Sequence, residues 1–261
     1  MTDFAFANLI TAATIAGSTT LGVTGWPATN TQLFGRPHIR AYSADLTGCR
    51  ITYDFGTTTA LGFVALFHPN FLTVTIQGHG SDAWGAPDYT SGLLTMGYAG
   101  NDRVHHIHRP TALAPFSKRF LSLSIPAQAT TDGATVFKLG SVWAGALVAA
   151  PRDLLIPHTD TKVAAREDVK TGDGRTLNRL ILDDPAFRVQ AKFKAADDTE
   201  LAAWRAIGRQ WDAAPGQAAL VHWIDAYLNH VYLMRRVNDE EWPNAAVWSE
   251  ATFDCVEITA G

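Results

Sequence analysis

Cysteine, basic residues and long hydrophobic runs are all scarce in this sequence. The two cysteines, Cys49 and Cys255, lie far apart in strand-like patterns, so we expect two buried free thiols, as in a protein folded in a reducing compartment. The net charge is −4 and no basic cluster reverses it locally, which argues against a nucleic-acid surface. The longest run of small apolar residues covers only 142–150, whereas a membrane-spanning helix needs roughly 20 residues. No basic signal-peptide region opens the chain, so we expect a soluble protein without membrane insertion.

Catalytic motifs are missing as well. No Gly-x-Ser-x-Gly elbow accompanies the serines, and no glycine-rich phosphate loop is followed by a lysine. The paired carboxylates at 183–184, 197–198 and 240–241 lie in turns or at the start of a helix, so an acid/base pair of a glycosidase is not expected. The sequence therefore predicts a protein that is not an enzyme and that holds no cofactor.

The clearest strand signals lie within residues 50–71. Apolar and polar residues alternate over 51–55, which is the period of a strand with one buried face. We expect Gly56 and the three threonines after it to form a tight turn. Residues 61–67 are almost continuously apolar, as in a strand buried on both faces, and Pro69 ends this strand because it cannot donate to a ladder.

Composition changes near Pro151 and indicates two domains. Ten short strands separated by turns, the first over 4–10, predict a jelly-roll β-sandwich over residues 1–150. Residues 151–261 are expected to form a smaller α+β domain with a hairpin turn at 171–174. Its main helix, at about 198–213, is predicted to be capped by Asp197 and to pack two tryptophans onto a sheet. The predicted fold class is therefore mostly β.

Four landmarks follow one another in the first 150 residues: Trp26-Pro27-Ala28-Thr29-Asn30, Tyr53-Asp54-Phe55-Gly56 with His68-Pro69-Asn70 closing the next strand, the strand 119–125, and Leu139-Gly140-Ser141-Val142-Trp143-Ala144-Gly145. In this order they resemble the discoidin-like (galactose-binding-like) jelly roll in tail proteins of long-tailed bacteriophages. The second half, with "VYLMRRV" and "VWSEATFD", is similar to the C-terminal part of phage tail-tip proteins.

This resemblance implies a structural protein of the phage tail tip or baseplate, made in the bacterial cytoplasm and located in the virion. Its implied partners are other tail proteins (tube, hub and fibre) and copies of itself in a ring of three- or six-fold symmetry. An alternative is a carbohydrate-binding module for a glycan of the host surface. A metal-dependent enzyme is a third, weaker hypothesis.

The segment 81–90 is predicted to be a loop that contacts a ligand or a partner. Trp84 lies among Asp82, Asp88 and Tyr89. An exposed aromatic ring could stack on a sugar while the carboxylates bind its hydroxyls. The same residues would equally anchor a subunit interface, where tryptophan and tyrosine contribute much of the binding energy. The sequence favours the interface and leaves both possibilities open.

Two further groups of residues were candidates for sites. His106 and His108 would project to one face of a strand, close enough to share a metal ion, but a structural zinc usually has four protein ligands and a catalytic one three. We therefore expect them to be surface histidines on an edge strand and predict no metal. Trp242 and Trp248 belong to a tryptophan-rich C-terminal region and are either core residues or part of an interface.

Overall fold

The computed structural model describes residues 2–33, 39–96, 105–111, 114–151, 155–163, 166–170, 176–180, 186–195, 197–214, 218–224, 229–236 and 249–257. The chain forms two compact units. The first, called the sandwich unit here, consists of Ala7–Leu147. The second, the terminal unit, combines Met1–Phe6 with Val148–Gly261. No helix in the described parts of the chain is long and apolar enough to cross a membrane.

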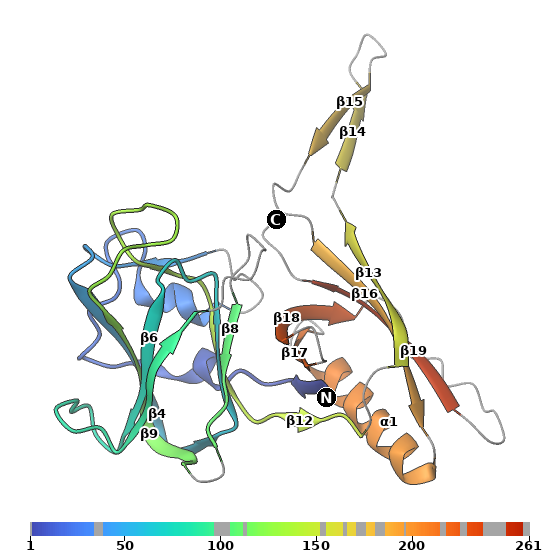
Figure 1. The fold of residues 1–261 in the computed structure, drawn as a ribbon, viewed down its shortest axis with the longest axis horizontal. Helices are drawn as coiled ribbons and strands as arrows, with labels where there is room; N and C mark the ends of the chain where they lie inside the picture. The colour runs from blue at the N-terminus through green and yellow to red at the C-terminus, as the bar shows by residue number, and fades with distance from the viewer. Residues whose placement is uncertain are drawn as a thin grey trace. The chain divides into compact units, whose positions relative to one another are not determined.

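The sandwich unit is a mostly antiparallel β-sandwich of the jelly-roll class (Figure 1). One sheet has the strand order β2 (Thr14–Ile15), β4 (Gly48–Leu61), β9 (Phe116–Pro126), β6 (Thr73–His79) and β7 (Tyr89–Thr95). The facing sheet has the order β11 (Val142–Gly145), β5 (Phe63–Phe67) and β8 (His105–His108). A ribbon of β3 (Ala41–Tyr42) with β10 (Lys138–Leu139) and two 3₁₀ helices, η1 (Leu9–Ala12) and η2 (Ala28–Gln32), complete the unit.

Alternation along the strands builds the core between these two sheets. Ile51 and Tyr53 of β4 are fully buried, as are Leu121 and Leu123 of β9, which lie opposite them. Every residue of β5 is buried, as the continuous apolar run predicts for a strand covered on both faces. The predicted fold class, mostly β with a jelly-roll sandwich, is therefore confirmed.

The predicted turn at Gly56 was wrong. The expected turn at Gly56 is part of β4, whose register with β9 shifts between Asp54 and Thr59. Gly56 has a φ of 76°, which glycine adopts without steric cost, so the strand bulges there and continues. The connection to β5 is Gly62 instead, whose amide donates to the Gly145 carbonyl at 2.8 Å.

The terminal unit contains a seven-stranded sheet and one helix. The strand order is β12 (Val148–Ala149), β1 (Thr2–Ala5), β17 (Ala218–Ile224), β18 (Asn229–Arg236), β19 (Ser249–Glu257), β16 (Ala186–Ala195) and β13 (Leu155–Val163). A separate hairpin pairs β14 (Arg166–Lys170) with β15 (Thr176–Leu180) and extends away from this sheet (Figure 1). The predicted turn at 171–174 lies outside the described residues.

The first strand belongs to this terminal sheet and not to the sandwich. The sequence predicted a sandwich strand over 4–10, but β1 ends at Ala5 and pairs with β12 and β17. Phe4 explains the placement, because its ring lies 6.4 Å from that of Trp204 and 5.7 Å from that of Trp211. The N-terminal segment therefore supplies part of the core of a unit that is otherwise built from the second half of the chain.

Helix α1 (Asp198–Ala213) follows the sequence prediction closely. The Asp197 carboxylate accepts a hydrogen bond from the Glu200 amide at 2.8 Å, which satisfies one of the free donors of the first turn. Trp204 and Trp211 recur on one face and are fully buried. The two predicted tryptophans thus form the apolar side of the helix, and Phe4 of β1 is part of what they pack against.

Candidate functional site

The loop that carries Trp84 is folded back onto the outer face of the five-stranded sheet. We call residues 80–88 the strap. The Trp84 indole N–H donates to Ser18 Oγ at 3.0 Å and to Asp82 Oδ1 at 2.8 Å. The second carboxylate oxygen of Asp82 accepts the Ser18 amide at 3.0 Å. Burial alone would raise the pKa of Asp82, but the hydrogen bonds from Ser18 and Trp84 outweigh it and lower this pKa.

The guanidinium group of Arg50 lies over the Trp84 ring, 5.0 Å from its centroid. Such a cation–π contact is worth roughly 0.5–1 kcal/mol at an exposed site and more when desolvated. Sequence analysis predicted Trp84 and Asp82 as ligand or interface residues, and the structure shows that both also fix the strap. Their predicted contact with a ligand or a partner stays a prediction.

The other two residues predicted in this loop have different surroundings. The Asp88 carboxylate pairs with Lys118 at 3.1 Å and lies 3.8 Å from His79 Nε2, and the hydrogen bond from Lys118 lowers its pKa. Tyr89 belongs to β7, not to the loop, and its side chain is buried. Its hydroxyl forms a 2.6 Å hydrogen bond with His108 Nε2. The prediction that Tyr89 belongs to the contact loop is therefore corrected, because β7 turns this ring into the core.

His106 and His108 are half-buried rather than on the surface. They lie on β8, an edge strand as predicted, opposite Leu66 and Val64 of β5. Residues directly opposite one another in a sheet share a face, and both β5 residues belong to the sandwich core. Burial lowers the pKa of both histidines, that of His106 to about 4 with a contribution from repulsion by His108. Among the residues that the structure describes, no three metal-ligating side chains form a cluster.

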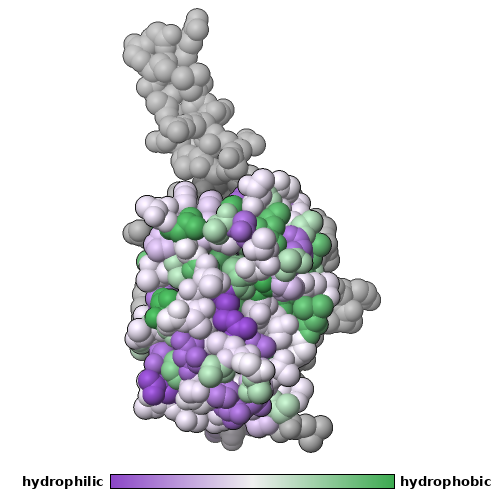
Figure 2. Space-filling model, turned by 90° about the vertical axis from the view of Figure 1, so that its left-hand side faces the viewer, coloured by the Kyte–Doolittle hydropathy of each residue, from purple (hydrophilic) through white to green (hydrophobic). Residues whose placement is uncertain are grey.

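Trp242 and Trp248, the interface candidates of the C-terminal region, lie outside the described residues. Exposed apolar side chains elsewhere are few. Among the described residues, the large exposed ones are Trp26 (43%), Leu72 (41%) and Leu93 (64%). On the side of the molecule shown in Figure 2, apolar residues form several small patches between polar ones. Of these three side chains, Trp26 alone has an aromatic ring, whose face can pack against a ligand.

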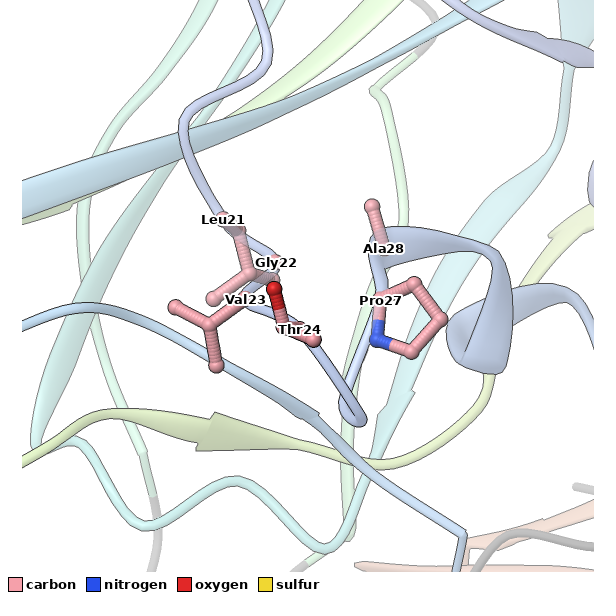
Figure 3. A pocket seen from close by; sticks show the side chains of 6 residues that line it. All are labelled: Leu21, Gly22, Val23, Thr24, Pro27 and Ala28. Carbon is pink, nitrogen blue, oxygen red and sulfur yellow. The ribbon is translucent and has the colours of Figure 1, made fainter.

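An open depression of about 540 Å³ is lined by residues that come before and after Trp26 in the chain, including its neighbour Pro27 (Figure 3). The depression is lined by Leu21, Gly22, Val23, Thr24, Pro27 and Ala28. Its volume is within the range of small-molecule sites, roughly 300–1,000 Å³. We call these six residues together with Trp26 and Tyr42 the Trp26 site.

The indole of Trp26 rests flat on the ring of Tyr42. The two centroids are 4.5 Å apart and the planes are nearly parallel, at 7°. Tyr42 covers one face of the indole, so the exposed area belongs to the opposite face and the ring edges. A turn holds the tryptophan in place, because Val23 and Trp26 exchange backbone hydrogen bonds of 3.3 and 2.9 Å. The Tyr42 amide also donates to the Trp26 carbonyl at 3.2 Å.

Backbone geometry makes glycine necessary at this turn. Gly22 has a φ of 124°, and a Cβ atom there would lie 2.7 Å from the Ala28 amide nitrogen. Gly25, with a φ of 86°, faces open space. The close approach at Gly22 brings the two arms of the loop together, and the depression lies between them (Figure 3).

Charged residues lie behind the aromatic pair. The Lys138 ammonium group is 5.8 Å from the centroid of Tyr42 and 2.7 Å from Asp132 Oδ2. Burial alone would raise the pKa of Asp132, but hydrogen bonds from Lys138, the Ala134 amide and Asn70 lower it to about 2. Asp132 is therefore ionised at neutral pH, and the ion pair persists there.

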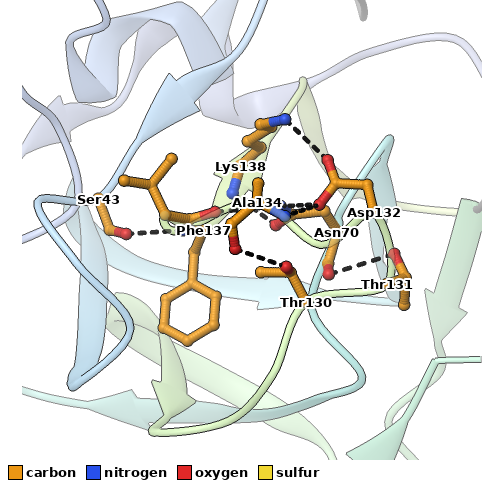
Figure 4. Close-up of polar contacts among 9 residues, drawn as sticks. Ser43, Asn70, Thr130, Thr131, Asp132, Ala134, Phe137 and Lys138 are labelled. Carbon is orange, nitrogen blue, oxygen red and sulfur yellow. Dashed lines mark hydrogen bonds and ion pairs between the residues drawn. The ribbon is translucent and has the colours of Figure 1, made fainter.

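Asn70 fixes this charged pair to the sandwich (Figure 4). Its side-chain N–H groups donate to Asp132 Oδ1 at 3.0 Å and to the Val136 carbonyl at 3.1 Å. Its side-chain oxygen accepts the Lys138 amide at 2.7 Å. The landmark Asn70 of the sequence is thus a structural corner that ties the loop before β10 to the end of β5.

Sequence analysis noted Trp26 only as a landmark and missed it as a site residue. Its neighbours Pro27 and Gly25 were a usable signal, since an aromatic residue within a turn cannot easily be buried. The partner ring, Tyr42, is 16 positions further along the chain, and nothing local in the sequence predicts that the two rings stack.

No protein-family model matches the chain, and no curated protein matches it. Among solved structures, the chain is similar to a mutant of the lectin binding domain of lectinolysin complexed with Lewis b, at 13% identity and a TM-score of 0.40, over 53% of this chain and 94% of that one. A fucose binding module of Streptococcus pneumoniae aligns at 8% identity and a TM-score of 0.40, over 54% and 98%. A fucolectin from the serum of Morone saxatilis (striped bass) aligns at 13% identity and a TM-score of 0.42, over 98% and 94%. All three TM-scores are below 0.5, so neither ligand nor function follows from these similarities.

Proposed function

We propose that the sandwich unit is a carbohydrate-binding module and that the Trp26 site binds the sugar. The observation that carries this proposal is the flat stack of Trp26 on Tyr42, with 43% of the tryptophan exposed, in a turn whose neighbouring residues line an open depression. The proposed activity is binding, and no catalytic step is assigned to the chain.

The chemistry of the Trp26 site suits a pyranose ring. The axial C–H bonds of a sugar form an apolar face with a slight positive charge, and the face of an indole is negative because of its quadrupole. Stacking the two faces removes apolar surface of both from water. The Thr24 hydroxyl and the backbone groups of the turn are donors and acceptors for sugar hydroxyls.

The Trp26 site is also organised before any ligand arrives. The turn at Trp26 is closed by backbone hydrogen bonds, and Tyr42 fixes the plane of the indole. Binding therefore needs little ordering of side chains, which otherwise costs about 0.5–1.5 kcal/mol for each flexible side chain. This rigidity favours binding of a sugar in spite of the small contact area.

The direct test compares Trp26→Ala with Leu93→Ala in glycan-array and calorimetric binding measurements. Leu93 is the matched control, because it is an exposed apolar residue on a different strand, β7. We expect Trp26→Ala to weaken sugar binding at least about tenfold, or ~1.4 kcal/mol, with an unchanged circular dichroism spectrum. Leu93→Ala should bind like the parent. Equal binding by Trp26→Ala, or no glycan bound by the parent, would refute the proposal.

The biological setting that we propose is the tail tip of a long-tailed phage, and this part rests on the sequence resemblance alone. The glycan would then be one of the host surface, and the partners would be other tail proteins and further copies of the chain. Antibody labelling of virions, together with light scattering of the purified protein, tests this setting. Labelling at the tail tip supports it, and a stable monomer that is absent from virions contradicts it.

A further inference from the structure

A latch holds the middle of the strap over the polar outer face of the five-stranded sheet, and the ion pair of Asp88 with Lys118 holds its end. The strap leaves β6 and reaches Ser18, which follows β2 at the opposite edge of that sheet. Seven of the nine strap residues are exposed or polar, and only Trp84 contributes a large apolar surface. The latch is the set of contacts that joins Trp84 and Asp82 to Ser18 and Arg50.

A row of polar side chains crosses the sheet near this latch. Thr52 of β4, Ser122 of β9 and Gln77 of β6 lie opposite one another in register. Thr52 and Ser122 are fully buried and are joined by a 3.3 Å hydrogen bond. The side-chain oxygen of Gln77 is buried, and it has no hydrogen-bond partner among the described residues. This row is a buried polar layer near the latch, and one of its acceptors has no partner among the described residues.

Arg50 is the least satisfied polar side chain of the latch. A guanidinium group has five N–H donors. In the part of the chain that the structure describes, Arg50 makes one side-chain hydrogen bond, to Ser122 Oγ at 3.4 Å. The Trp84 ring holds the group in place, and burial lowers its pKa. By contrast, Arg119 forms two bonds to Asp54, of 2.8 and 2.7 Å.

Asp82 supplies the complementary acceptor. Each of its oxygens accepts one hydrogen bond within the latch, and an ionised carboxylate has capacity for about four. Its side chain is exposed. A fixed donor fork, an exposed carboxylate and a tryptophan edge therefore meet on one surface.

We propose that Arg50, Asp82 and Trp84 form a second sugar site, which takes a neutral pyranose through two adjacent hydroxyl groups. Arg50 donates to the oxygen of one hydroxyl, the neighbouring hydroxyl donates to Asp82, and the ring packs against Trp84. A neutral sugar is favoured over an acidic one, because the charges of Arg50 and Asp82 cancel and a ligand carboxylate would be repelled by Asp82. The inference extends the proposed carbohydrate-binding function to a second surface and rests on that function for its ligand class.

Two sites on one chain would change how the protein holds a glycan. When two sites engage one branched or repeated glycan, the second contact forms at the high effective concentration that the first contact creates. Two weak sites can thereby give strong attachment to a dense surface of sugars, while a free monosaccharide binds weakly to each.

The test uses the full chain labelled with 5-fluorotryptophan, which gives each tryptophan its own fluorine resonance. The probes are methyl glycosides of galactose, glucose, mannose and fucose, each titrated to millimolar concentration. Trp26→Phe and Trp84→Phe assign the two resonances. We expect the Trp84 resonance to move with its own saturation curve, and Arg50→Gln to reduce that shift at least fivefold while the Trp26 shift remains. Arg119→Gln is the matched control and should alter neither shift.

The outcomes separate the two proposals. A Trp26 shift without a Trp84 shift overturns the second site and leaves the proposed function standing. A Trp84 shift alone, abolished by Arg50→Gln, supports the second site and overturns the placement of the first. No shift of either resonance with any probe overturns both. If Arg50→Gln fails to fold, the Trp84 shift of the parent protein still decides.

Discussion

Acid should lower the free energy of unfolding of the sandwich unit, because it protonates the half-buried side chain of His106. His106 Nε2 is buried without a hydrogen-bond partner among the described residues. Burial, with a smaller contribution from His108, lowers the pKa of His106 from 6.5 to about 4. Protonation of the folded state would place a charge at the edge between the two sheets, next to the Tyr89–His108 hydrogen bond.

The sign of the change in stability with pH follows from proton linkage. Between pH 6.5 and about 4, the unfolded chain binds a proton at this histidine and the folded chain does not, so stability falls as the pH falls. The stabilisation is complete above pH 6.5 and is lost as the pH drops to about 4. At 1.36 kcal/mol for each unit of pKa, the loss is about 3 kcal/mol. His108, whose pKa burial also lowers, adds to the loss in the same direction.

This loss can be measured by hydrogen exchange at several pH values, followed on peptides of β5 and β8. The exchange rates are corrected for the intrinsic effect of pH. We expect the free energy of opening to be about 2.5 kcal/mol lower at pH 4.5 than at pH 7.5, since the loss is not yet complete at pH 4.5. In His106→Leu most of this difference should disappear, because the buried titrating group is gone. His79→Asn, which changes a histidine on the outer face, is the control and should keep the slope. The same slope in His106→Leu and the parent would refute the reasoning.

Two matched pairs of substitutions test the loops around the Trp26 site. Gly22→Ala should lower the free energy of unfolding by about 2 kcal/mol or more and reduce sugar binding, because its Cβ would meet the Ala28 amide at 2.7 Å. Gly25→Ala, where a Cβ meets nothing within 4 Å, should lower it by about 1 kcal/mol. Thermal unfolding measures the stability and calorimetry the binding, and equal losses of stability would contradict the argument. Asn70→Ala should cost about 2–3 kcal/mol, since it leaves the half-buried amide of Lys138 and the Asp132 carboxylate without this partner. Asn30→Ala should cost about 1 kcal/mol, because among the described residues the Asn30 side chain makes one hydrogen bond, to the Arg40 carbonyl. A smaller cost at Asn70 than at Asn30 in urea unfolding would contradict the structural role of Asn70.

Local patterns were sufficient for several elements. The continuous apolar run predicted β5 because a strand covered on both faces has no polar positions. The spacing from Asp197 to Glu200 predicted the start of α1, because a capping bond joins residues three positions apart. In both cases a pattern within a few residues was enough to identify the element.

The strand β1 and the bulge at Gly56 were predicted incorrectly for a common reason. Phe4 can be buried in either unit, and the tryptophans that determine its place lie about 200 residues further along the chain. The threonines after Gly56 suit a turn or a strand equally, and pairing with β9 decides between them. A pattern within a few residues contains no information on such distant partners.

The sequence by itself determined the mostly β class, the buried strand β5 and the capped helix α1. These depend on periodicity, propensity and composition, which are local properties. Only the tertiary structure decided that Trp26 stacks on Tyr42, that Arg50 lies over Trp84, and that two histidines expected at the surface face the core. Each of these contacts joins residues from different strands or loops, and the free energy of such contacts exists only after the sheets have paired.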